Sequence, residues 1–166
     1  NEQLKNIDVD QEGEYDYYSA DSTDHMGFEW EAAFTLNERW RLSANGALVM
    51  NYFNNGNSLP NIPATLFNLS ANYSPQKNML LFVHWRRVGH MYVDNDNTEA
   101  GMIDPYGIWD IGARYQWGNI EAMVKFNNIF DKLYATYGYG YELDGFQAFY
   151  WPGATRNSFM NISYTF

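Results

Sequence analysis

The sequence predicts an all-β protein, an antiparallel up-and-down transmembrane β-barrel with about seven or eight strands. Apolar and polar residues alternate with period two in one segment after another, no stretch sustains a helical period, and tight turns alternate with long loops. The chain has 166 residues, of which 19% are aromatic and only 18% charged. Its longest apolar run, 79–83, is five residues. A transmembrane helix needs roughly 20, so a helical membrane protein is excluded.

The first three predicted strands are the most regular. From 26 to 36 the even positions are apolar, whereas the odd positions include Glu29 and Glu31. From 40 to 52 the even positions again carry mostly large apolar side chains, and from 65 to 73 the odd positions do. Because successive side chains of a strand point to opposite faces, each segment has one apolar and one hydrophilic face.

Four further segments continue the pattern. The apolar positions are odd in 79–86 and in 109–117, and even in 120–127 and in 160–166. The segment 4–9 is a candidate for the remnant of an eighth strand. The connections alternate between tight turns (37–39, 75–78 and 118–119) and long loops rich in Gly, Asn, Asp and Tyr (53–63, 94–106 and 138–156).

Side-chain size predicts which face is outside. A closed eight-stranded barrel has an interior just wide enough for its own side chains, so the bulky residues of the apolar face should point outward, to lipid. These include Trp30, Trp40, Trp85, Trp109 and Trp117. The opposite face should then line a lumen, where charged side chains stay hydrated or pair with one another: Glu29, Glu31, Arg86, Asp110, Arg114, Glu121 and Lys125.

Strand length supports a membrane barrel. Ten residues at about 3.4 Å rise, tilted by about 45°, project roughly 24 Å, close to the apolar band of an outer-membrane barrel. Trp40, Tyr73, Trp117 and Phe166 lie on the apolar face beside a tight turn or the C-terminus. They are predicted to form an aromatic girdle at one membrane interface.

Composition excludes other classes. The net charge of −10 argues against nucleic-acid binding, and the absence of cysteine removes disulfides, thiolate metal sites and cysteine nucleophiles. The acidic stretch Asp8–Asp24 is predicted to be a solvated loop rather than a metal site, because it lacks the spacing of a calcium loop. The three histidines show no metal-ligand spacing, so neither a bound metal nor a cofactor is expected. The start at Asn-Glu-Gln indicates a processed chain or a fragment.

Five motifs in order resemble the C-terminal part of TonB-dependent outer-membrane receptors, and a terminal Phe166 completes the set. Gly27–Glu31 resembles the family's Gly-Val-Glu-Leu-Glu strand, and Leu59–Pro63 its proline-marked entry into the next strand. Arg86–Asp94 resembles Arg-x-Val-Gly-x-x-Tyr-x-Asp, and it is followed by Asn97, Asp110 and Tyr115. Asn128–Tyr134 resembles Asn-Leu-Phe-Asp-Lys-x-Tyr, and Pro152–Arg156 resembles Pro-Gly-x-x-Arg.

The resemblance implies that the chain is about the last third of a 22-stranded barrel, with the plug domain, the energy-coupling segment and the earlier strands outside it. It implies long loops outside the cell, tight turns in the periplasm and location in the outer membrane of a Gram-negative bacterium. The implied partners are outer-membrane lipid, a small nutrient ligand, the TonB complex through the absent parts, and the barrel-assembly machinery. The last would read a C-terminal signal that resembles Met160, Ile162, Tyr164 and Phe166.

Two groups of side chains are candidates for ligand binding. Aromatic residues gather in the loop 138–156, where they could stack on a catecholate or sugar-like ligand, or pack as a cluster above the barrel rim: Tyr139, Tyr141, Phe146, Phe149, Tyr150 and Trp151. Basic residues of the hydrophilic parity could attract an anionic ferric chelate, or pair with Glu29, Glu31 and Asp110 in the wall: Arg86, Arg114, His84 and His90. Asn128 falls on the apolar parity, which predicts a β-bulge there.

The sequence thus predicts no enzyme, but part of a receptor that captures and actively imports a scarce nutrient, with a ferric siderophore as the expected ligand. The alternative is an autonomous eight-stranded outer-membrane barrel with a structural or adhesion role, whose side-chain-filled interior transports nothing.

Overall fold

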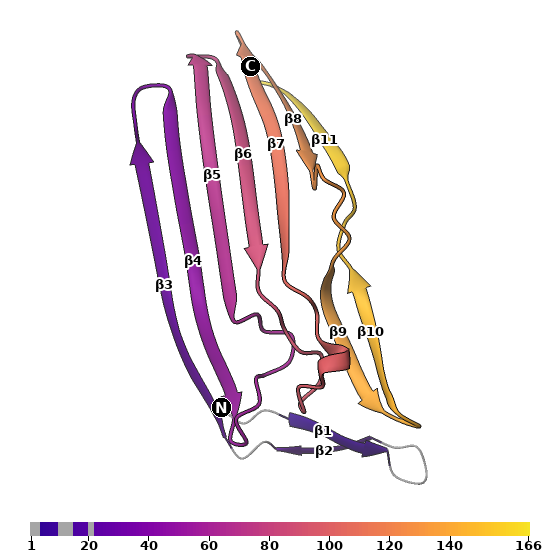
Figure 1. Ribbon diagram of the computed structural model, residues 1–166. Coiled ribbons are helices and arrows are strands. Elements are labelled where there is room, and N and C mark those ends of the chain that lie inside the picture. Colours follow the sequence, from indigo (N-terminus) through magenta and orange to yellow (C-terminus); the bar gives the residue numbers. More distant parts are fainter. Residues whose placement is uncertain (1–3, 10–14, 20–21) are drawn as a thin grey trace.

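A seven-stranded antiparallel sheet dominates the computed structural model, which describes residues 4–9, 15–19 and 22–166. The strands of the sheet lie in the order β11-β8-β7-β6-β5-β4-β3, so neighbours in sequence are neighbours in space except for β11, which pairs with β8. Two hairpins, β1-β2 and β9-β10, form separate two-stranded sheets (Figure 1).

Most strands of the large sheet have the ten or more residues that the sequence predicts for membrane crossing, and β8 and β11 have eight. The strands of the large sheet are β3 (Thr23–Thr35), β4 (Trp40–Phe53), β5 (Thr65–Gln76), β6 (Met79–Val88), β7 (Tyr106–Trp117), β8 (Ile120–Asn127) and β11 (Asn157–Tyr164). The hairpins contain β1 (Leu4–Val9), β2 (Tyr15–Ser19), β9 (Ala135–Glu142) and β10 (Phe146–Pro152), and a single 3₁₀ turn, η1, spans Glu99–Gly101.

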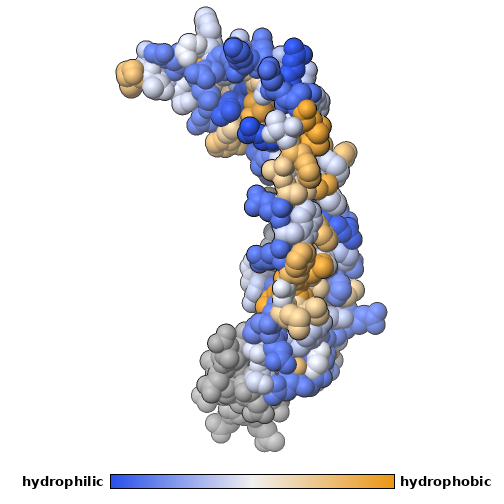
Figure 2. All heavy atoms as spheres, turned by 90° about the vertical axis from the view of Figure 1, so that its left-hand side faces the viewer, coloured by the Kyte–Doolittle hydropathy of each residue, from blue (hydrophilic) through white to orange (hydrophobic). Residues whose placement is uncertain are grey.

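The register keeps each face of the sheet uniform. Trp40 pairs with Tyr73, Leu69 with Trp85, and Trp85 with Trp109, so apolar residues meet apolar residues across neighbouring strands. Viewed from the β3 edge, orange side chains run along the middle of the sheet, and its upper end is mostly blue (Figure 2). The predicted alternation of an apolar and a hydrophilic face is therefore confirmed.

Two predictions about the ends of the sheet were wrong, and a third, that 4–9 forms a strand, was confirmed. The segment 138–156 is not a long loop, because most of it forms β10 and part of β9. The segment 4–9 is a strand, but it pairs with β2 and not with the large sheet. The stretch Asp8–Asp24 is not simply a loop, since β2 and the start of β3 lie within it, while residues 10–14 and 20–21 lie outside the described part.

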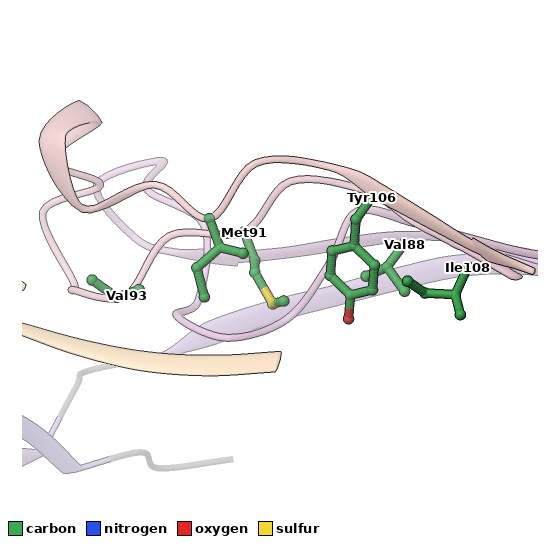
Figure 3. Close-up of a cluster of buried hydrophobic side chains, with 6 residues drawn as sticks. Val88, Met91, Val93, Tyr106 and Ile108 are labelled. Atoms are coloured by element: carbon green, nitrogen blue, oxygen red, sulfur yellow. The ribbon is translucent and has the colours of Figure 1, made fainter. Parts of the chain in front are cut away.

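The buried core lies at the long-loop end of the sheet. Leu66, Val88, Tyr106 and Ile108 project from its hydrophilic face there, and the loop between β6 and β7 covers them with Met91, Val93 and Ile103. Figure 3 shows Val88, Tyr106 and Ile108 pointing to the same side. A smaller cluster of Phe53, Leu59 and Ile62 anchors the loop between β4 and β5. The loop end is thus a packed cap, whereas the apolar face of the sheet stays exposed.

The large sheet is open, with β3 and β11 as its two edge strands. A closed eight-stranded barrel would need these edges to meet, and in the described residues they do not pair. This geometry fits a section of a larger barrel, as the resemblance implies, and does not support the autonomous alternative. No helix among the described residues has the length and apolarity needed to cross a membrane.

Two consecutive residues of β5 test which face contacts lipid. Leu69 lies on the apolar face, four residues or about 10 Å above Tyr73, and Ser70 points to the other face. We expect Leu69→Arg to destabilise the full-length protein in phospholipid vesicles by about 2–4 kcal/mol, because it places a charge in hydrocarbon. Urea titration should show a much smaller loss of unfolding free energy for Ser70→Arg. Equal losses would contradict the assignment of the faces.

Candidate functional site

A hydrophilic hollow crosses β4 to β7 below the packed cap. It has a volume of about 310 Å³ and is open on one side. His84 and Arg86 of β6 and Asp110 of β7 line it, together with amide and hydroxyl side chains that include Asn45, Asn68 and Ser70. Asn68 donates a hydrogen bond of 2.9 Å to Asn45 Oδ1, which fixes part of the floor. The hollow offers both charged and neutral hydrogen-bonding groups to a ligand.

The ion pairs of this face differ from those predicted. Lys125 Nζ lies 3.0 Å from Asp110 Oδ2, and Arg114 Nη1 lies 3.7 Å from Glu121 Oε2. Among the described residues no ion pair joins Arg86 to Glu29, Glu31 or Asp110. The wall network therefore exists, but it leaves the Arg86 guanidinium available in the hollow.

The structure separates the four basic candidates. His84 and Arg86 share the hollow, and His84 pairs in register with Asp110. Arg114 pairs in register with Leu80, six residues along β6 from Arg86, which is about 20 Å at 3.4 Å per residue. His90 lies beyond the end of β6 and contacts the Tyr92 ring edge-on. Only His84 and Arg86 can therefore act together on one ligand.

The aromatic residues of the β9-β10 hairpin lie on two opposite faces. Phe146 and Ala148 pack against the core of the cap, and the Tyr150 hydroxyl lies 3.4 Å from the Ala100 carbonyl oxygen. Phe146 and Tyr150 therefore do not belong with the other aromatic candidates. The opposite face, here called the aromatic face, consists of Tyr137, Tyr139, Tyr141, Phe149 and Trp151.

The rings of the aromatic face form a stack. Tyr139 and Phe149 lie 5.2 Å apart at an angle of 13°, and Tyr141 and Phe149 lie 6.0 Å apart at 8°. Trp151 contacts Tyr137 at 5.2 Å and Tyr139 at 5.6 Å. Tyr139 and Trp151 are 42% and 50% exposed, so the stack presents flat apolar surface to solvent with polar tips.

Tyr137 is not among the candidates predicted from the sequence, because the predicted loop begins at Gly138. The signal was present, since Tyr137, Tyr139 and Tyr141 alternate with glycines at the spacing of a strand. Gly138 and Gly140 are needed on the other face, where an added Cβ at either position would lie under 3.0 Å from Val93 or Phe146. The alternation thus places small residues against the cap and large ones outside.

Asn128 links the large sheet to the hairpin through a turn rather than the predicted bulge. It is 2% exposed and has a φ of 48°. Its Nδ2 donates to the carbonyl oxygens of Lys132 and Ala154, its Oδ1 accepts from the Lys132 N–H, and its own N–H donates to Asp110. The turn lies between the Asn127–Asn157 pair and the backbone hydrogen bond from Gly153 to Tyr134. One side of the turn has six residues (128–133) and the other has three (154–156). The structural role predicted for Asn128 consists of these hydrogen bonds.

A family model described as TonB dependent receptor-like, beta-barrel matches residues 2–129 of the chain. This chain belongs to the TonB-dependent receptor β-barrel family. No curated protein matches it. The family's barrels are outer-membrane proteins of Gram-negative bacteria, and its members are transporters rather than enzymes.

Solved structures share the fold of this TonB-dependent receptor barrel. The ferric yersiniabactin uptake receptor FyuA from Yersinia pestis is 25% identical with a TM-score of 0.73, over 84% of this chain and 23% of its own. The siderophore receptor PiuA from Acinetobacter baumannii is 20% identical with a TM-score of 0.71, and the match covers 97% of this chain and 24% of PiuA. The copper transporter OprC is 16% identical with a TM-score of 0.76, and the match covers 100% of this chain and 27% of OprC. The chain thus spans about a quarter of the solved proteins it resembles.

The tight-turn end of the TonB-dependent receptor barrel carries the expected girdle residues on the apolar face. The Trp40 and Tyr73 rings stack at 4.5 Å, and Tyr164 meets Phe166 edge-on at 5.1 Å. Trp117 is 75% exposed. Within the described chain, no group of three or more His, Cys, Asp or Glu side chains could hold a metal ion.

Replacement of Asn128 tests the linking turn. We expect Asn128→Ala to destabilise the full-length receptor by about 2–4 kcal/mol, because buried backbone groups lose their partners and alanine is strained at positive φ. Asn128→Gly should lose less, since glycine tolerates this φ. Urea titration in phospholipid vesicles measures both, and equal losses would show that backbone conformation contributes nothing.

Proposed function

We propose that this chain is the C-terminal barrel section of an outer-membrane receptor that captures a ferric siderophore and imports it actively. The observation that carries the proposal is that the chain offers two surfaces suited to such a ligand. The aromatic face supplies stacked rings, and the hollow below the cap supplies the Arg86 guanidinium, which no ion pair among the described residues neutralises.

The two surfaces suit the two parts of such a ligand. A catecholate has flat rings, which stack favourably on Tyr139, Phe149 and Trp151. Its iron complex is anionic, and Arg86 offers a charge-assisted hydrogen bond to an anionic oxygen. His84 beside Arg86 provides a second polar contact.

The related structures support a metal-containing cargo. One is a ferric yersiniabactin uptake receptor, one a siderophore receptor and one a copper transporter. Since similar folds serve different cargoes, the cargo of this chain depends on its own side chains. The stacked rings favour an aromatic chelate over a bare metal ion.

The remaining partners follow from the same assignment. The girdle residues Trp40, Tyr73, Trp117 and Phe166 lie at the inner interface of the outer membrane, in contact with lipid. The C-terminal residues Met160, Ile162, Tyr164 and Phe166 act as the signal for the barrel-assembly machinery. The TonB complex supplies energy through parts of the receptor outside this chain, so transport requires the full-length protein.

Binding to the full-length receptor tests the proposal. The iron(III) complex of 2,3-dihydroxybenzoate should bind, and Tyr139→Ala combined with Trp151→Ala should weaken binding at least tenfold, or about 1.4 kcal/mol. Arg86→Gln should also weaken it, and more at low salt than at high salt, because the loss is electrostatic.

Trp117→Ala is the matched control, because it removes an exposed tryptophan at the opposite end of the sheet. Intrinsic fluorescence quenching by the iron complex measures all variants. Tighter binding of ferric citrate or of Cu²⁺ than of the catecholate, with no effect of the aromatic variants, would overturn the proposal.

A further inference from the structure

The β9-β10 hairpin is positioned without the backbone ladder of the large sheet. It forms its own two-stranded sheet, and β7 and β8 pair only up to Ile111 and Phe126. A hairpin of two strands is marginally stable alone in water, so contacts outside its own strands must hold it in place. The orientation of the aromatic face depends on those contacts.

One side chain imitates a neighbouring strand at the free edge of β9. Asn61 Nδ2 donates to the Gly138 carbonyl oxygen at 2.9 Å, and Asn61 Oδ1 accepts from the Gly138 N–H at 2.9 Å. Gly138 is opposite Tyr150 in the hairpin, and both of its backbone groups are thus satisfied by the same carboxamide. The two bonds are equivalent to one rung of a sheet, made by a side chain from a loop that is 77 residues away in sequence.

The backbone of Asn61 is itself fixed. Its φ is 60°, a conformation that asparagine tolerates better than most residues, and its N–H donates to the Tyr92 carbonyl oxygen at 2.8 Å. Leu59, two residues earlier, is only 2% exposed. Asn61 therefore joins the β4-β5 loop, the β6-β7 loop and the hairpin at one point.

Gly138 allows the close approach that this contact needs. An added Cβ would lie 2.6 Å from Val93 Cγ1 and 2.9 Å from the Phe149 carbonyl oxygen. Gly138 is buried between Tyr137 and Tyr139, both of which point to the exposed side. A shift of the β9 backbone at Gly138 would therefore move the aromatic face directly.

We propose that Asn61 is the positioning residue of the aromatic face: its carboxamide holds β9 on the cap, and with it the rings of Tyr137 and Tyr139. This inference rests on the proposed function only for its effect on a ligand. Its structural part stands on the contacts of Asn61 alone.

Hydrogen exchange in the full-length receptor tests the structural part. Asn61→Gly keeps the backbone conformation and removes the carboxamide, so the Gly138 amide should exchange at least tenfold faster. Asn61→Asp keeps an acceptor for that amide but loses the donor to the carbonyl oxygen, and it should give an intermediate rate.

Asn97→Gly is the matched control. Asn97 has a φ of 57°, and it bonds in the same reciprocal way to the backbone of Ser58, but it makes no hydrogen bond to the hairpin. In Asn97→Gly, the exchange rate of the Gly138 amide should stay within about twofold of wild type. Unchanged exchange at Gly138 in Asn61→Gly, or an equal increase in both variants, would overturn the proposal.

Binding of the iron(III) complex of 2,3-dihydroxybenzoate separates this inference from the proposed function. If Asn61 positions a functional aromatic face, Asn61→Gly should weaken binding at least fivefold, and Asn97→Gly should not. If wild type fails to bind the complex while Gly138 exchange still responds to Asn61→Gly, the proposed ligand is wrong and the positioning role stands. Normal binding by Asn61→Gly with fast exchange would show that the aromatic face needs no positioning.

Discussion

Every crossing strand of this molecule must face two solvents, hydrocarbon on one side and water on the other. Because side chains alternate along a strand, this constraint fixes the register to within one residue: a slip would place Arg86, Asp110 and Lys125 in lipid. The observed pairings keep Trp85 beside Trp109 on one face and His84 beside Asp110 on the other. The uniform faces, the aromatic residues at the tight turns and the polar hollow all depend on it.

The same constraint explains how much could be predicted from sequence. The sequence predicts the seven strands of the large sheet because each repeats the alternation over seven or more residues. The hairpin was missed because glycine occupies one face of β9, and a run of glycine and tyrosine has the composition of a loop. Part of its structure is decided by a distant partner, the Val93 side chain, which leaves no room for a Cβ at Gly138.

The candidate site was predictable only in part, for a related reason. Period two correctly put His84 and Arg86 on one face, but it could not show that Lys125 pairs with Asp110 or that the strand ends before His90. The contacts of Asn61, Asn97 and Asn128 were also beyond reach. In each, an asparagine at positive φ bonds to the backbone of a separate segment, and such contacts follow from the folded cap rather than from local sequence.

The unequal turn at Asn128 has a consequence for variation among receptors of this type. Because one side of the turn has six residues and the other has three, the turn accommodates a difference in register between the large sheet and the hairpin. Insertions, deletions or exchanged aromatic residues beyond it need not shift a single pairing in the membrane. The length and side chains of the tip can therefore vary while the strand pairings of the wall stay the same.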